Sequence, residues 1–383
     1  MPLGKLWEVQ QIPTSSSADT SRETMSRSQL FQPIVVGAMK LQHRVVLAPL
    51  TRLRATADKE HVPVNPLMSE YYSQRGRRPG TLLISEGTII SLRAAGLNRT
   101  PGIWSEKQIT EWKKITAAVH AKGSYIYLQI SAVGRAARPD NIQAGGYDVH
   151  APSPIPIKEG DPVPRELTLT EIHEYVDVYA QAASNAVHKA GFDGVELHGA
   201  NGYFIDQFLQ SNANQRKDAY GGSVENRSRF GLEVVDAVVK AIGEQRTAIR
   251  LSPWSTYQSM KMADPKPQFT HFVSALKASY PDFSYIHLVE PEDEPTATEE
   301  SNDFIRDIWL PRPLITCQNY NRETAIKQSE KTGELIAFGR WFIANPDLPD
   351  RIEKDIPFTP FNVNTFYTST EEGYIDYPFA EAK

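Results

Sequence analysis

Residues 194–200 read GVELHGA, a short apolar run between two stretches of helical periodicity. In residues 170–187 apolar side chains recur every three or four positions, and Thr168 with Glu171 has the spacing of a capping box. A similar pattern covers 226–242 and stops before Gly243. A strand set between two amphipathic helices is the repeating unit of parallel α/β proteins. This stretch therefore predicts a parallel sheet covered by helices.

The same alternation extends along the chain on both sides of this unit. Further helical patterns occupy 108–122 and 321–330. The expected strands are 45–50, 81–87, 125–131, 194–200, 247–253, 285–291, 313–318 and 335–340. Eight strands with intervening helices and no linker to a second domain favour one closed (β/α)8 TIM barrel over an open doubly wound sheet. We expect residues 29–383 to form this single domain.

Three other regions complete the predicted architecture. Residues 34–44 are typical of a short β-hairpin, which we expect to cap the amino-terminal mouth of the barrel. Length beyond a minimal barrel falls in the loops 132–168 and 289–312 and in the tail 355–383. Residues 1–28 are serine-rich with little hydrophobic periodicity, so we expect a disordered, flexible extension. Acidic residues among them argue against a targeting peptide, and the predicted location is cytoplasmic, with organellar targeting left open.

Composition excludes several classes of function. The net charge is −5 and no basic stripe is present, which argues against a nucleic-acid partner. No apolar run approaches the ~20 residues that span a bilayer, so no membrane partner is expected. The single cysteine, Cys317, rules out an intramolecular disulfide and a cysteine-based zinc site. Without an HExxH motif or a second histidine at ligand spacing, no metal site is predicted.

Polar residues gather where the predicted strands end. They are Thr51, Gly87, Gln129, His198, Asn201, Arg250, Gly339 and Arg340. A single histidine at such a place is more often structural than catalytic, and a strand arginine usually has a buried carboxylate partner. Active sites of these barrels lie at the carboxyl ends of the strands. The joint placement of these residues at one barrel face therefore favours an active site.

The motifs around these positions closely resemble those of the old yellow enzyme family. The most specific run is His198-Gly-Ala-Asn201-Gly-Tyr203, followed by Gln207-Phe-Leu and Arg216-Lys-Asp-Ala-Tyr-Gly-Gly222-Ser-Val-Glu-Asn-Arg227. Matching pieces appear in family order at Ala48-Pro-Leu-Thr51-Arg52, Ser85-Glu-Gly87-Thr88, Pro101-Gly-Ile-Trp104, Arg250-Leu-Ser-Pro253, Phe338-Gly-Arg340 and Thr365-Phe-Tyr367. The resemblance spans roughly residues 29–380, and no single short motif carries it.

The resemblance implies a flavin mononucleotide (FMN) cofactor across the barrel mouth. Thr51 would hydrogen-bond a flavin carbonyl, Gln129 the pyrimidine edge, and Arg250 the N1 and O2 atoms, where a cation stabilises the anionic reduced flavin. Gly339 and Arg340 would hold the phosphate. The other implied cofactor contacts are Pro49, Leu50, Gly87, Asn319 and Phe366.

Two positions depart from the family pattern. A glycine-containing turn normally follows the seventh strand, but this chain has Cys317-Gln318-Asn319, so we expect tighter backbone access to the phosphate. Ser131 stands where a bulkier side chain is common, which would enlarge the substrate pocket. Tyr367 would belong to the lid over that pocket.

The resemblance also implies a mechanism, that of an ene-reductase. His198 and Asn201 would donate hydrogen bonds to a carbonyl or nitro oxygen of an electron-poor alkene, and Tyr203 would protonate its α-carbon. NADPH or NADH would reduce the flavin in a ping-pong cycle, which needs no GxGxxG domain. The alternatives are a flavin-dependent isomerase, disfavoured by Tyr203, and a non-catalytic flavin-binding protein. Enones, enals or nitroalkenes are the expected substrates, and a monomer or homodimer is the expected assembly.

Overall fold

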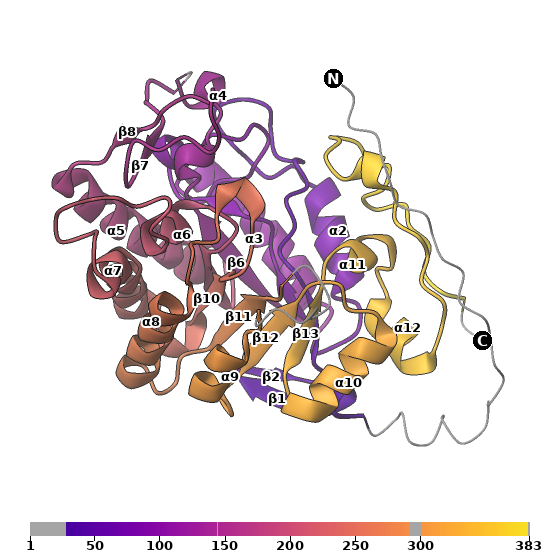
Figure 1. The fold of residues 1–383 in the computed structure, drawn as a ribbon. Helices are drawn as coiled ribbons and strands as arrows, with labels where there is room; N and C mark the ends of the chain where they lie inside the picture. Colours follow the sequence, from indigo (N-terminus) through magenta and orange to yellow (C-terminus); the bar gives the residue numbers. More distant parts are fainter. Residues whose placement is uncertain (1–27, 144, 292–299, 382–383) are drawn as a thin grey trace.

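A computed structural model describes residues 28–143, 145–291 and 300–381 of the chain (Figure 1). Eight parallel strands form a closed barrel, because β3 pairs with both β4 and β13 and β4 also pairs with β6. The barrel strands are β3 (Val45–Leu47), β4 (Leu82–Ile84), β6 (Tyr125–Ser131), β9 (Gly194–Gly199), β10 (Thr247–Leu251), β11 (Tyr285–Val289), β12 (Leu314–Cys317) and β13 (Leu335–Phe338). Each lies within a predicted run, so the predicted TIM barrel is confirmed.

Helices surround this barrel. The longer ones are α2 (Leu67–Arg75), α3 (Glu106–His120), α5 (Leu169–Ser184), α7 (Val224–Ile242), α8 (Lys266–Ser279) and α10 (Arg322–Thr332). Shorter ones are α4 (Pro139–Gln143), α6 (Phe204–Leu209), α9 (Asp303–Trp309), α11 (Arg340–Ala344) and α12 (Leu348–Lys354). The four predicted helices are confirmed, including the Thr168–Glu171 capping box on α5 and the end of α7 before Gly243. None of the described helices is long and apolar enough to cross a membrane.

The predicted hairpin is also confirmed. β1 (Ile34–Val36) and β2 (Met39–Leu41) pair antiparallel, and the Ala38 N–H donates to the Gln245 carbonyl just before β10. Their inner side chains join the apolar cluster inside the barrel, so the hairpin closes its amino-terminal mouth. Gly37 makes the turn with φ of 53°, and a Cβ there would lie 2.1 Å from the Gln245 oxygen. Only glycine, which has no Cβ, allows the turn to lie this close to the Gln245 carbonyl.

Additional short elements lie at the opposite, carboxyl-terminal end. The strands β7 (His150–Ala151) and β8 (Arg165–Glu166) and helix α4 fall in the long predicted loop 132–168, and β5 (Thr88–Ile89) extends the sheet beside β6. In Figure 1 these loop elements lie at the top and the hairpin at the bottom. The tail, drawn in yellow, passes α12 and α11 towards the top.

The predicted flexible extension, residues 1–28, lies outside the described residues except for its last residue. Ser28 is buried, and its hydroxyl accepts a hydrogen bond from the Leu30 N–H at the start of a 3-10 turn (Gln29–Phe31).

Candidate active site

The side chains that fill the barrel change character along its axis. Near the hairpin they are apolar, among them Val46, Leu82 and Leu335. Towards the carboxyl ends, six buried polar side chains replace them: Gln129, Glu196, His198, Arg250, His287 and Cys317. Their burial in one layer below the strand ends makes this the candidate active site.

Gly87 faces this polar layer. A methyl group at position 87 would lie 3.5 Å from Gln129 Oε1 and 4.0 Å from both His198 Cδ2 and Ser131 Cβ. The structure therefore brings four of the predicted residues, from β6, β9 and the segment between β4 and β5, around one point. The missing side chain at Gly87 leaves room for a flat ligand to approach the backbone.

His198 lies at the centre of this arrangement. Its Nδ1 is buried and has no hydrogen-bond partner among the described residues. Burial, together with the nearby charges of Arg250 and His287, holds the pKa of His198 well below its ordinary value. The imidazole is therefore neutral at physiological pH, and it offers one N–H donor and one acceptor.

Asn201 and Tyr203 lie on the loop that follows β9. Asn201 adopts the left-handed conformation with φ of 57°, and its N–H donates to Ser252 Oγ at 2.7 Å. Asparagine tolerates this conformation better than most residues. The next N–H, of Gly202, donates to the buried Asp206 carboxylate at 2.8 Å, so two consecutive backbone N–H groups fix the loop.

The Tyr203 ring lies 4.7 Å from the His198 ring, measured between centroids. Burial, aided by Tyr257 and Tyr367, raises the pKa of Tyr203 to about 12. Its phenol is therefore protonated at neutral pH. Tyr257 and the predicted lid residue Tyr367 are 58% and 66% exposed, so aromatic side chains lead from the protein surface to Tyr203.

A buried hydrogen-bonded network under the site was not predicted. Gln129 Nε2 donates to Glu196 Oε1 at 2.8 Å, and Glu196 Oε2 lies 2.9 Å from His287 Nδ1. This leaves Gln129 Oε1, rather than its amide nitrogen, facing Gly87. Glu196 precedes His198 by two positions on β9, and alternation along a strand places both inside the barrel. This two-residue spacing on a buried strand is the sequence pattern that could have indicated the network.

Within residues 28–143, 145–291 and 300–381, Arg250 does not have the carboxylate partner that a buried strand arginine usually has. Its Nη2 donates to Cys317 Sγ at 3.1 Å, and its Nε is buried without a partner among the described residues. The β10 to β11 register sets Arg250 beside His287. A fixed cation thus lies in the polar layer.

The predicted phosphate end lies at the ends of β12 and β13. Gln318 and Asn319 have φ of 120° and 52°, so the backbone follows a path that glycine favours although no glycine is present. Gly339 approaches the predicted residue Leu50, since a Cβ there would lie 3.1 Å from Leu50 Cδ2. The side chains of Asn319 and Arg340 are exposed.

The tail is fastened over this end of the barrel by two buried arginines that carried no predicted role. Arg52 Nε and Arg54 Nη1 both donate to the Phe366 carbonyl, at 3.1 and 2.8 Å. Phe366 is itself only 9% exposed and lies below the Arg52 guanidinium. The sequence feature that could have indicated these two arginines is the Arg-x-Arg spacing directly after Thr51.

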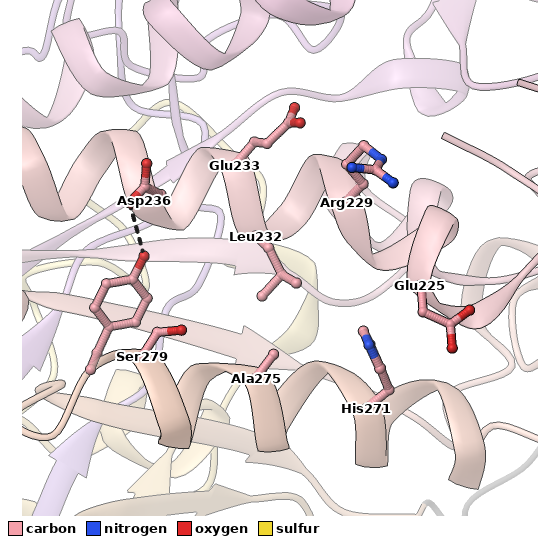
Figure 2. Close-up of a pocket in the computed structure, with 9 residues that line it drawn as sticks. Glu225, Arg229, Leu232, Glu233, Asp236, His271, Ala275 and Ser279 are labelled. Atoms are coloured by element: carbon pink, nitrogen blue, oxygen red, sulfur yellow. Dashed lines mark hydrogen bonds between the residues drawn. The ribbon is translucent and has the colours of Figure 1, made fainter. Parts of the chain in front are cut away.

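A hollow lies on the outer wall of the barrel, between α7 and α8 (Figure 2). Its volume is about 450 Å³, and its polar lining includes Glu225, Arg229, Asp236 and His271. Asp236 accepts a hydrogen bond from Tyr280 at 3.2 Å, while Leu232 and Ala275 form its middle. Within the described residues, no three histidine, cysteine or acidic side chains gather as a metal site would require. The chemistry of the barrel mouth makes the mouth the stronger candidate.

Comparison with known proteins supports this choice. The model of the NADH:flavin oxidoreductase / NADH oxidase family matches residues 29–358. The chain is 47% identical over 371 residues to the NADP-dependent oxidoreductase lnbE of Aspergillus flavus. This alignment covers 92% of this chain and 97% of that protein. It is 48% identical over 363 residues to the chanoclavine-I aldehyde reductase fgaOx3 of Penicillium roqueforti, with the same coverage.

Two further comparisons extend this picture. The probable inactive reductase easA of Epichloe festucae var. lolii is 46% identical over 372 residues, covering 93% of this chain and 97% of that protein. Among solved structures, the Old Yellow Enzyme from Pichia sp. AKU4542 superposes with a TM-score of 0.86 at 36% identity, covering 94% of this chain and 95% of that one. The similarity therefore covers the barrel and the site together.

Proposed function

Because the chain belongs to the NADH:flavin oxidoreductase / NADH oxidase family, which includes the old yellow enzymes, we propose that it is an FMN-dependent ene-reductase. The observation that carries this proposal is the buried His198 Nδ1, which has no hydrogen-bond partner in the described part of the chain; the His198 ring lies next to Tyr203. An unpaired polar atom in a barrel core is costly, and a bound ligand can offset that cost.

The residues around the mouth fit FMN. The unpartnered Arg250 Nε supplies positive charge, Gly87 leaves open space, and Gln129 Oε1 offers an acceptor. Thr51 and Phe366 would complete the ring site, with Pro49 and Leu50 beside it, and Asn319, Gly339 and Arg340 would hold the phosphate. When bound, FMN supplies hydride chemistry, taking a hydride from a reduced nicotinamide nucleotide and passing it to an alkene carbon.

His198 and Asn201 would hold the substrate by its activating oxygen. The neutral His198 imidazole can donate one hydrogen bond to a carbonyl or nitro oxygen, and the Asn201 side-chain amide can donate a second. The two residues are three positions apart, and the Asn201 backbone is fixed by its bond to Ser252. Donors aimed at an oxygen that gains charge during the reaction typically contribute ~10²–10³ in rate each.

Tyr203 would supply the proton that completes the reduction. Its raised pKa keeps the phenol protonated at neutral pH, and its place beside His198 puts it next to the bound alkene. A positioned general acid contributes typically ~10²–10⁴ in rate. A competent proton donor favours net reduction over isomerisation.

The substrate we propose is an α,β-unsaturated aldehyde, within the broader class of enones, enals and nitroalkenes. A relative named as an aldehyde reductase supports the aldehyde, and the relative named as NADP-dependent supports NADPH as the electron donor. Ser131 lies near Gly87, and its small side chain would suit a bulky substrate.

Anaerobic reduction followed by oxidation tests this function. The purified protein should show a flavin absorption spectrum that NADPH bleaches, and an enal should restore it with formation of the saturated aldehyde. No flavin after gentle purification and reconstitution with FMN would contradict the proposal. Reoxidation by none of the enones, enals or nitroalkenes would favour a non-catalytic flavoprotein. A rearranged, unreduced product would favour an isomerase.

A further inference from the structure

Cys317 holds the Arg250 side chain inside the barrel. The two residues lie on β12 and β10, separated by β11, and Cys317 Sγ accepts from Arg250 Nη2 at 3.1 Å. Both side chains are more than nine-tenths buried. The Arg250 Nε, which the sulfur does not reach, has no partner among the described residues.

A buried guanidinium needs a compensating negative charge. Removing a cation from water costs several kcal/mol unless an anion or good acceptors replace the solvent. The strand neighbours of Arg250 in the parallel register are His198 and His287, and an imidazole supplies no negative charge. Sulfur is therefore the partner that the described chain offers to Arg250, and a thiolate would balance its charge.

The surroundings of the sulfur favour its ionisation. Although burial raises the pKa of the Cys317 thiol, the charges of Arg250 and His287 lower it more, to about 7. The charged and titratable groups facing this pair include His287 and Tyr285 on β11, Glu196, which lies 2.9 Å from His287 Nδ1, and His198 on β9. Burial keeps His198 neutral, so it does not compete for the thiolate.

We propose that Cys317 is a positioning residue that holds Arg250 as a thiolate and takes up one proton when two electrons enter the site. Once protonated, the thiol no longer neutralises the Arg250 guanidinium. The positive charge of the guanidinium is then available to stabilise the negative charge that builds up at the bound cofactor. This inference rests on the proposed binding of FMN.

The step balances simply. A hydride from the reduced nicotinamide brings two electrons and one proton, and the oxidised nucleotide leaves. The Cys317 thiolate gains one further proton from water, forming an S–H bond. No sulfur atom changes its oxidation state, and no further reductant is required.

The test is the pH dependence of the flavin midpoint potential. FMN-loaded wild type, Cys317→Ser and Cys317→Ala are titrated potentiometrically between pH 6 and 9. Serine keeps a hydrogen-bond acceptor for Arg250 but does not ionise in this range. Above pH 7 the wild type should take up two protons per two electrons and each variant one, so the slope of potential against pH is twice as steep in the wild type. Below pH 7 the slopes should coincide.

Equal slopes over the whole range in three FMN-loaded proteins would overturn this inference and leave the proposed function intact. Failure of the wild type to bind FMN would overturn both. In the apoprotein, thiolate absorbance near 240 nm, taken as the difference between wild type and Cys317→Ser, should appear with a midpoint near neutral pH. Its absence up to pH 9 would also overturn the inference, because Arg250 would then be paired with a neutral thiol.

Discussion

The Arg54 guanidinium donates a hydrogen bond to the backbone carbonyl of Phe366 at 2.8 Å, and so joins the end of β3 to the tail. Arg54 also donates to the carbonyl of Thr365 and to the Thr368 hydroxyl, and it stacks over the buried Tyr374 ring. The tail that carries the predicted lid residue Tyr367 thus depends on a buried side chain near the other end of the sequence.

Replacing Arg54 by Met should loosen this tail. Several buried carbonyls would lose their donor, at roughly 1–3 kcal/mol for each group left unsatisfied. We expect the free energy of unfolding to fall by about 2–5 kcal/mol in total, and amide exchange to accelerate in residues 365–374. Hydrogen exchange followed by mass spectrometry measures the second effect. Arg138→Met, at an exposed arginine, is the control. Unchanged exchange in the tail of the Arg54 variant would contradict the assignment.

Tyr203→Phe should separate the two halves of the catalytic cycle. Loss of the phenolic proton should slow alkene reduction by ~10²–10⁴-fold. Reduction of the flavin by NADPH requires no proton from Tyr203 and should keep its rate. Stopped-flow measurement of each half-reaction checks this. The matched control is Tyr257→Phe, since Tyr257 is exposed nearby. Similar losses in both half-reactions would show that Tyr203 serves binding rather than proton transfer.

Much of the fold could be predicted from sequence periodicity. The strand 194–200 and its flanking helices stand out because buried strands are continuously apolar and the helices α5 and α7 have one polar face. Helix α2 was missed because its buried face contains Tyr71, Tyr72 and Arg75, which do not form a recognisable apolar stripe. Arg75 is buried because its guanidinium donates to the carbonyls of Phe342 and Tyr374, tertiary contacts that local sequence does not encode.

The candidate site was predictable only in part, for a similar reason. Residues at strand ends, such as His198 and Arg250, follow from the barrel topology once the strands are placed. Partners across the barrel, such as Cys317 for Arg250, depend on the register between strands, which the sequence pattern does not fix. The two arginines that hold the tail bind backbone carbonyls, and such contacts leave no complementary side chain to find in the sequence.

The pH dependence of stability should reflect two buried carboxyl groups. Burial raises the pKa of Glu86 and of Asp206 to about 7. The folded state therefore binds more protons than the unfolded state between about pH 4 and 7, so stability falls as pH rises through this window. Glu86→Gln should remove part of this fall, on the order of 1–3 kcal/mol, because each pKa unit corresponds to about 1.4 kcal/mol.

Urea unfolding at pH 5 and pH 8 measures this difference. Relative to wild type, the Glu86 variant should be more stable at pH 8 and little changed at pH 5. Because Asp206 still titrates, part of the slope of stability against pH should remain. Glu159→Gln, at an exposed glutamate, should leave the slope unchanged. A Glu86 variant that follows the wild type at both pH values would mean that Glu86 is ionised in the folded protein without cost.

The last prediction concerns the backbone at Gln318, where φ is 120°. A non-glycine residue in such a conformation carries strain of order 1–3 kcal/mol, whereas glycine adopts it freely but loses roughly 0.5–1 kcal/mol through added freedom in the unfolded chain. Gln318→Gly should therefore raise the unfolding free energy by about 0–2 kcal/mol. Gln318→Ala keeps the strain while removing the side chain, so it should give no such gain. If alanine stabilises as much as glycine, the side chain rather than the backbone is the source of the strain. If neither stabilises, the rest of the turn compensates for the positive φ.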